Sequence, residues 1–196
     1  MKTNLSSQIK LERVPVRYYN PQSDIERAEL TRNEKIYTRI FENSNEGSNY
    51  LAAHIVDLIK RNVEKKGYCN IALGAGRSTH SVYVSLIKLY RRGEISFKDV
   101  RIFNISEFFP VSPEGPSTFK RLQQIFLNHV DVKQENIYTF DTTVSKADLY
   151  DYCLAYQAKI EDCGGIDLSL LEIGANGKLA FNEPGSLSTS TCRLVL

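Results

Sequence analysis

Apolar positions along the chain follow two alternating patterns, short continuous runs and longer stretches with helical spacing. The continuous runs predict buried strands at Cys69–Leu73, Val100–Ile105, Ile137–Phe140 and Ile166–Ile173. The helical spacing between them predicts helices over Ser78–Arg92, Ser117–Asn128 and Lys146–Asp162. Strands that alternate with helices form parallel β-α-β units. The pattern therefore predicts the α/β class, with a Rossmann-like layered fold and a mainly parallel sheet.

The N-terminal part has a different pattern. Residues 1–22 look irregular, and Ser23 followed three residues later by Glu26 forms a capping box that predicts a charged helix to about Phe41. A polar loop over 43–48 precedes a second helix, which ends at Gly67. We expect residues 1–47 to be an N-terminal extension with a charged helix, and residues 48–196 to be an incomplete α/β domain.

Composition excludes several classes of function. The chain has 196 residues, 42% hydrophobic and 24% charged, which is ordinary for a soluble globular domain. A net charge of +2 gives no electrostatic argument for a nucleic-acid partner. The N-terminus lacks a signal peptide, and no run approaches the roughly 18 apolar residues of a membrane span. We therefore expect a cytoplasmic protein without a membrane or nucleic-acid partner.

The cysteines and histidines do not predict a metal site. None of the four cysteines, Cys69, Cys153, Cys163 and Cys192, forms a Cys-x-x-Cys pair, and the three histidines are scattered. We expect reduced thiols and no metal.

The loop after the first predicted strand could bind an anion. It consists of Gly74, Ala75, Gly76, Arg77, Ser78 and Thr79. Small residues expose backbone N–H groups, a helix N-terminus follows, and Arg77 adds positive charge. The alternative is a tight turn with a serine cap, and we favour phosphate binding because turn, cap and cation coincide. A dinucleotide fingerprint fits less well, since its third glycine falls at Thr79.

Two further loops carry polar groups after predicted strands. Ser106 and Glu107 follow the second strand, and Glu107 is a candidate acid or base, although taken alone it reads as a solvated loop carboxylate. The last strand precedes a turn containing Asn176 and Lys178, followed by Glu183. This turn fails the P-loop pattern, and Asn176-Gly177 could simply be a hairpin turn. Because parallel strands end at one sheet edge, we expect the three loops to converge there.

One segment of the chain reads Ile173-Gly174-Ala175-Asn176-Gly177-Lys178-Leu179-Ala180-Phe181-Asn182-Glu183-Pro184-Gly185. It resembles the active-site loop of the glucosamine-6-phosphate deaminase/isomerase family, G-x-G-x-D-G-H-I-A-F-N-E-P. The resemblance runs from about residue 48 to the end and includes 95–100, 128–137 and 156–168. It implies a modified Rossmann fold and conversion of glucosamine 6-phosphate to fructose 6-phosphate and ammonia without a cofactor, by general acid–base steps.

The residues that the resemblance marks as chemical are largely substituted. The proton-carrying Asp of F-N-x-D-E-[YF] is Ser106 here, with Glu107 in place, and the Asp-Gly-His unit reads Asn176, Gly177, Lys178. Glu183 alone is retained. An amide does not titrate near neutral pH, and an unactivated serine is a poor base. The pattern therefore favours a sugar-phosphate-binding domain with weak or altered catalysis, with Glu107 and Lys178 as a conceivable substitute pair.

The candidate sites and partners follow from these observations. The predicted catalytic positions are Ser106, Glu107, Asn176, Lys178 and Glu183. The predicted substrate- or phosphate-binding positions are Gly74, Ala75, Gly76, Arg77, Ser78, Thr79, Gly174, Gly177 and Arg193. The alternative function is a non-catalytic, sugar-phosphate-sensing or structural domain of a longer protein.

The end of the sequence suggests a fragment. Family members continue well beyond the position of Leu196, and Arg193–Leu196 reads as the start of a strand. We expect a sugar phosphate as ligand, and either a homo-oligomer or association with the missing C-terminal region.

Overall fold

The computed structural model describes residues 15–112 and 114–195. The chain forms two compact units, residues 1–51 and 52–196. The division falls inside the helix α3 (Ser44–Lys66), as does the expected boundary between residues 47 and 48. The two units are described separately below.

The first unit contains two short helices, α1 (Val16–Tyr19) and α2 (Asp24–Thr31). The predicted capping box is formed in a shifted version: the Glu26 N–H donates to Ser23 Oγ at 3.2 Å, and Glu26 Oε2 accepts from the N–H of Gln22, the residue before the cap, at 2.7 Å. The predicted extension of this helix to Phe41 is wrong. No residue of the helix is buried, and a short helix without packing ends readily near residues of low helix propensity such as Thr31 and Asn33.

A second capping box starts α3 inside the segment predicted to be a loop. The Glu46 N–H donates to Asn43 Oδ1 at 3.0 Å, and Glu46 Oε2 accepts from the Glu42 N–H at 3.3 Å. The loop expected over 43–48 is therefore mostly helical. The predicted end at Gly67 is confirmed, with φ +82 at that glycine. Residues 1–14 of the segment expected to be irregular lie outside the described residues.

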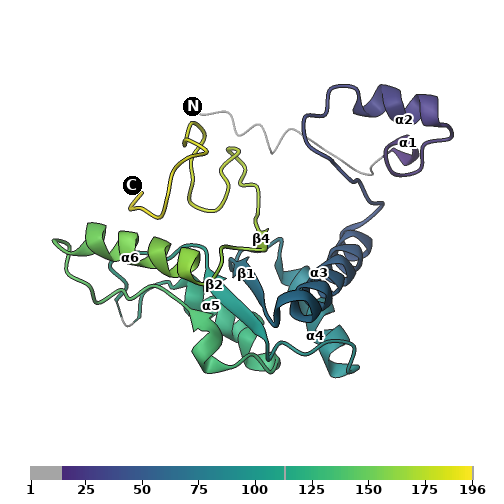
Figure 1. Cartoon of the computed structure of the whole chain (residues 1–196). Helices are drawn as coiled ribbons and strands as arrows, with labels where there is room; N and C mark the ends of the chain where they lie inside the picture. The colour runs from purple at the N-terminus through teal and green to yellow at the C-terminus, as the bar shows by residue number, and fades with distance from the viewer. Residues whose placement is uncertain (1–14, 113, 196) are drawn as a thin grey trace. The chain divides into compact units, whose positions relative to one another are not determined.

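The second unit is built on a four-stranded parallel sheet (Figure 1), which confirms the predicted class. Its strands are β1 (Cys69–Leu73), β2 (Val100–Asn104), β3 (Ile137–Tyr138) and β4 (Leu168–Leu170). The strand order is β3-β2-β1-β4, and Leu73 of β1 lies opposite both Asn104 and Leu170. The two outer strands are shorter than predicted, and residues 193–195 form no strand although the sequence predicted one.

Helices cover both faces of the sheet, with α6 on one side and α3 and α4 on the other (Figure 1). The remaining helices are α4 (His80–Arg91), α5 (Thr118–Ile125), the 3₁₀ turns η2 (Leu127–His129) and η3 (Gln134–Asn136), and α6 (Leu149–Asp162). On the α6 side, Ala72 and Phe103 form a buried cluster with Tyr156 and Cys163. All five residues of β1 are buried, as expected for a central parallel strand.

Candidate functional site

The order of the strands places the topological switch point of the sheet between β1 and β4. The chain runs from β1 to β2 to β3 on one side of the sheet and returns to the other side of β1 as β4. In open α/β sheets, ligands bind at such a switch point, outside the carboxyl ends of the strands. The loops that follow β1, β2 and β4 all start at this edge, because their strands are parallel and paired in register. The predicted convergence of three polar loops is therefore present.

The loop after β1 binds the carboxylate of Glu172, a residue of the loop after β4. The N–H of the buried Thr79 donates to Glu172 Oε1 at 2.7 Å. A Cβ built on Gly76 would lie only 1.6 Å from Glu172 Oε2, so the carboxylate fills the space that this glycine leaves open. The Ser78 cap considered from the sequence is not formed, since α4 starts at His80 with Thr79 at the cap position. Arg77 is exposed.

The loop after β2 is tied to the start of α5 by Glu107. Its Oε1 accepts from the N–H groups of Phe108 and Thr118, at 2.9 and 2.8 Å. Its Oε2 accepts from Ser117 Oγ at 2.7 Å and from the Phe119 N–H at 3.0 Å. Burial by itself would raise the pKa of Glu107, but these four hydrogen bonds outweigh it and hold the pKa below its ordinary value. This geometry is that of a helix cap, and it supports no proton-donating role near neutral pH.

Ser106 lies beside this cap. Its backbone carbonyl accepts a hydrogen bond from the Thr118 hydroxyl, so the residue is fixed through its main chain. The Phe108 ring lies 5.1 Å from the Phe181 ring, which joins the loop after β2 to the segment before Glu183.

The loop after β4 folds into a tight turn that groups three of the predicted catalytic residues. Gly177, at φ +85, donates its N–H to the Gly174 carbonyl at 2.9 Å, and Ile173 and Leu179 form an antiparallel bridge. The hairpin-turn alternative for this segment is therefore present in the structure. The same turn brings Asn176 Nδ2 to 2.6 Å from Glu183 Oε2, and Lys178 Nζ to 3.8 Å from Glu183 Oε1. Lys178 thus pairs with Glu183. Glu107 and Lys178, considered from the sequence as a substitute acid–base pair, line the same cavity.

A cavity of about 810 Å³ lies between these loops and the C-terminal segment. Among the predicted site residues it is lined by Ser106, Glu107, Lys178, Glu183 and Arg193. The residues from Gly74 to Thr79, and Gly174, Asn176 and Gly177, do not line it. Arg193 Nη2 donates to Asn182 Oδ1 at 2.8 Å and to Ser186 Oγ at 3.2 Å, so the guanidinium is held against the loop that carries Glu183.

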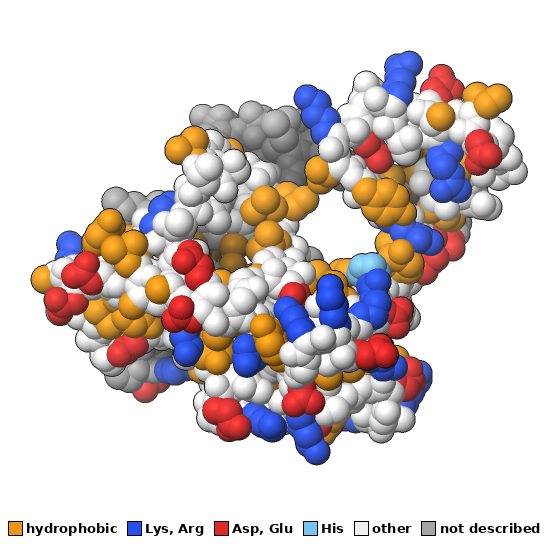
Figure 2. All heavy atoms as spheres, viewed as in Figure 1, with side chains coloured by type: hydrophobic (Ala, Val, Ile, Leu, Met, Phe, Trp, Pro, Cys, Tyr) orange, Lys and Arg blue, Asp and Glu red, His pale blue; other side chains and the backbone are white. Residues whose placement is uncertain are grey.

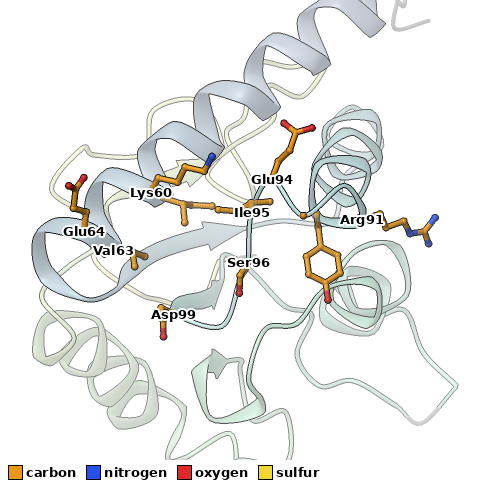
Figure 3. A pocket seen from close by; sticks show the side chains of 11 residues that line it. Lys60, Val63, Glu64, Arg91, Glu94, Ile95, Ser96 and Asp99 are labelled. Atoms are coloured by element: carbon orange, nitrogen blue, oxygen red, sulfur yellow. The ribbon is translucent and has the colours of Figure 1, made fainter.

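A second cavity, of about 770 Å³, lies at the opposite edge of the sheet. Lys60, Val63 and Glu64 of α3 face Glu94–Ser96 of the loop after α4 and Asp99, which precedes β2 (Figure 3). Both signs of charge line it, and it lies at the amino ends of the strands, where the general rule for parallel sheets places no ligand. We therefore take the 810 Å³ cavity as the candidate site.

Surface charge, metal ligands and helix hydropathy add three observations. On the face shown in Figure 2, basic and acidic side chains are interspersed. Within residues 15–112 and 114–195, no group of three or more His, Cys, Asp or Glu side chains is arranged to hold a metal ion. None of the described helices is both long enough and apolar enough to cross a bilayer.

Sequence reasoning missed Glu172. The signal was present in the loop pattern G-x-G-x-D-G-H, whose first glycine falls on Glu172. Asn182 was also passed over as a partner of Arg193, because no local pattern links the two.

Comparisons with known proteins bear on the family to which the chain belongs. The sequence model of the family described as glucosamine-6-phosphate isomerases/6-phosphogluconolactonase matches residues 42–186. A putative glucosamine-6-phosphate deaminase-like protein of Bacteroides thetaiotaomicron is 45% identical over 197 residues, which cover 100% of this chain and 30% of that protein. A glucosamine-6-phosphate deaminase of Thermoanaerobacter sp. is 36% identical over 137 residues, covering 69% of this chain and 53% of the relative.

Solved structures of related proteins match the fold of this chain. A monomeric glucosamine-6-phosphate deaminase, described as a missing link of the NagB superfamily, matches with a TM-score of 0.68 and 28% identity. The match covers 76% of this chain and 59% of that one. The 6-phosphogluconolactonase from Plasmodium vivax matches with a TM-score of 0.63 at 18% identity, which shows a shared fold alone. The chain thus spans from under a third to about three fifths of the length of these relatives.

Proposed function

Because the chain belongs to the glucosamine-6-phosphate isomerase/6-phosphogluconolactonase family, we propose that it binds a hexose or amino-sugar phosphate with weak or altered catalysis. The domain we propose for this role is residues 48–196. The domain is glucosamine-6-phosphate deaminase/isomerase-like, and the resemblance implies that deamination in this family needs a proton carrier and an acid–base relay for ring opening.

The observation that carries the proposal is the environment of Glu183. One of its oxygens accepts from the Asn176 amide at 2.6 Å, and the other faces the Lys178 ammonium at 3.8 Å. A relay requires neighbours that exchange protons near neutral pH, and an amide does not. Glu183 therefore accepts a hydrogen bond from an amide at the position where the family pattern has an aspartate that could exchange a proton with it.

The other loops support the same conclusion. Glu107 is held by four donors as a cap, and Ser106 has no activating base among its described contacts. What the cavity offers is a set of donors and acceptors suited to sugar hydroxyls, with Lys178 and Arg193 for negative charge. Such groups bind a polar ligand without moving protons.

The test is ammonia release from glucosamine 6-phosphate, with the Thermoanaerobacter deaminase as the active control. We expect the unmodified protein to release ammonia undetectably or very slowly, since losing one acid–base group typically costs about 10²–10⁴-fold. The triple variant Ser106→Asp, Asn176→Asp and Lys178→His should release it faster. Vigorous deamination by the unmodified protein would contradict the proposal.

Binding is measured separately by calorimetry with glucosamine 6-phosphate and glucosamine. We expect tighter binding of the phosphorylated sugar, and equal affinities would contradict a sugar-phosphate site.

A second candidate function is a non-catalytic sensing or structural domain of a longer protein. The observation that favours it is the Bacteroides relative, which resembles the whole of this chain with only 30% of its own length. Saturable turnover of any sugar phosphate would favour the enzyme, and binding without turnover would favour the sensor.

A further inference from the structure

The loops after β1 and β4 meet at the switch point of the sheet, where an anionic ligand would approach the N-terminus of α4. Leu73 and Leu170 are register partners, so the backbone leaves both strands at the same level. Glu172 follows Leu170 by two residues, which brings its side chain over the residues from Gly74 to Thr79. The region where a ligand anion would be expected is therefore within reach of a carboxylate of the chain itself.

The contacts of Glu172 are those of a bound anion. Its Oε1 accepts the Thr79 N–H at 2.7 Å, at the cap position of α4. The Cβ that Gly76 lacks would lie 1.6, 2.0 and 2.2 Å from Oε2, Cδ and Oε1 of the carboxylate. Backbone N–H groups at a helix N-terminus favour negative charge at this position. A phosphate in the same place would need the same donor and the same space.

We propose that Glu172 determines whether phosphate can bind the loop from Gly74 to Thr79, by occupying its anion position when no ligand is bound. This inference rests on the proposed function, since the loop is the predicted binding segment for the phosphate of the same ligand. With Glu172 in place, the loop does not line the 810 Å³ cavity. A phosphate monoester binds there only when the Glu172 side chain swings out, because two anions repel each other at contact distance. The apparent affinity is then the intrinsic affinity reduced by the fraction of molecules in which Glu172 is displaced.

The competing interpretation is that Glu172 only fastens the loop after β4 to α4. Both interpretations predict some loss of stability when the side chain is removed, so stability does not separate them. They differ in phosphate affinity, which a fastening residue would not raise on removal.

The experiment titrates inorganic phosphate and glucosamine 6-phosphate into the protein, Glu172→Gly and Glu172→Gln, following the Thr79 amide in ¹H–¹⁵N spectra. A hydrogen bond to a charged group corresponds to a displaced fraction of roughly one in ten to one in a hundred. Glu172→Gly should therefore bind phosphate roughly tenfold to a hundredfold more tightly at Thr79. Glu172→Gln keeps the shape without the charge and should show a smaller gain.

The matched control is Glu135→Gln. It removes the same charge from an exposed residue of η3, which precedes β3 and so lies at the opposite edge of the sheet. It should leave phosphate affinity unchanged. A dispersed amide spectrum of each variant establishes that it is folded. If Glu172→Gly does not fold, Glu172→Gln provides the test.

The outcomes separate this inference from the proposed function. Equal phosphate affinities of the protein and both Glu172 variants, or a Thr79 signal unmoved in all of them, overturn the inference. If glucosamine 6-phosphate still binds better than glucosamine in that case, the proposed function stands without it. If phosphate affinity at Thr79 rises in Glu172→Gly while the sugar adds nothing to binding, the inference stands and the proposed function fails.

Discussion

Replacing Glu107 with glutamine tests whether this residue is a helix cap. Each carboxylate oxygen of Glu107 accepts two hydrogen bonds, from Phe108 and Thr118 on one side and from Ser117 and Phe119 on the other. Glutamine replaces one oxygen with an NH₂ group. If Oε1 is replaced, the N–H groups of Phe108 and Thr118 face a donor; if Oε2 is replaced, the Phe119 N–H does, while the Ser117 hydroxyl can turn and accept.

The expected cost follows from that count. A hydrogen bond to a charged group contributes about 1.5–3 kcal/mol, and an acidic group at a helix N-terminus contributes about 0.3–1 kcal/mol. Because the side chain is only partly buried, water compensates some of the lost bonds. We therefore expect Glu107→Gln to lower the free energy of unfolding by about 2–3 kcal/mol at pH 7.

The direction of the pKa shift of Glu107 determines how the stability difference between the protein and Glu107→Gln changes with pH. The folded pKa of Glu107 is lowered, so its contribution to stability is fully present above the unfolded pKa of 4.5 and is lost as pH falls through the lower folded value. The difference between the protein and Glu107→Gln should therefore be constant from pH 8 to about 5 and shrink below about 4.5. A structural role without ionisation would give no such change.

Urea denaturation at pH 7 and at pH 3.5, together with hydrogen exchange of the Thr118 and Phe119 amides, measures both effects. These two amides should exchange faster in Glu107→Gln, because they lose their acceptor. The control Glu135→Gln should change stability by less than about 0.5 kcal/mol. An unchanged urea midpoint at pH 7, with unchanged exchange at both amides, would refute the cap.

Two further predictions concern Gly76 and the thiols of Cys69 and Cys192. Gly76→Ala should displace the Glu172 carboxylate and destabilise the protein by about 1–2 kcal/mol, but it should cost little in a Glu172→Gly background. Thermal melts measure this double-mutant cycle, and additive effects of the two substitutions would contradict the contact. Burial raises the pKa of the Cys69 and Cys192 thiols to about 12, so both should resist alkylation at pH 8 in the folded protein and react once unfolded, whereas mass spectrometry showing both alkylated at the rate of an unfolded chain would contradict this.

The sequence predicted the second unit well, because local patterns and tertiary packing agree there. The run Cys69–Leu73 is buried at all five positions, as its continuous apolar character indicated. The helix predicted from Ser23 to Phe41 failed for the opposite reason. Its start has a local cause, the capping box, but its continuation would have needed an apolar face against a partner, and no residue of α2 is buried.

The site was predictable in its location and only partly in its contacts. That polar groups gather at one sheet edge follows from parallel strands, which the sequence indicates. That Glu107 caps α5 depends on donors ten to twelve residues away, and that Glu172 reaches Thr79 depends on a separation of 93 residues. The contact between Glu172 and Thr79 arises from the order of the strands, which no pattern in a single sequence specifies.

The carboxylates of the loops after β2 and β4 share one property that bears on function. All three are satisfied by the chain itself: Glu107 by the start of α5, Glu172 by Thr79, and Glu183 by Asn176. A ligand that engages these groups must first break hydrogen bonds that already exist, so its net gain per contact is small. A catalytic relay needs the reverse, carboxylates left free to exchange protons with the substrate. The substitution of Asn176 for the aspartate of the family pattern and the presence of Glu172 at its first glycine act in the same direction, since each adds an internal partner at a position where the pattern leaves a proton carrier or an open space.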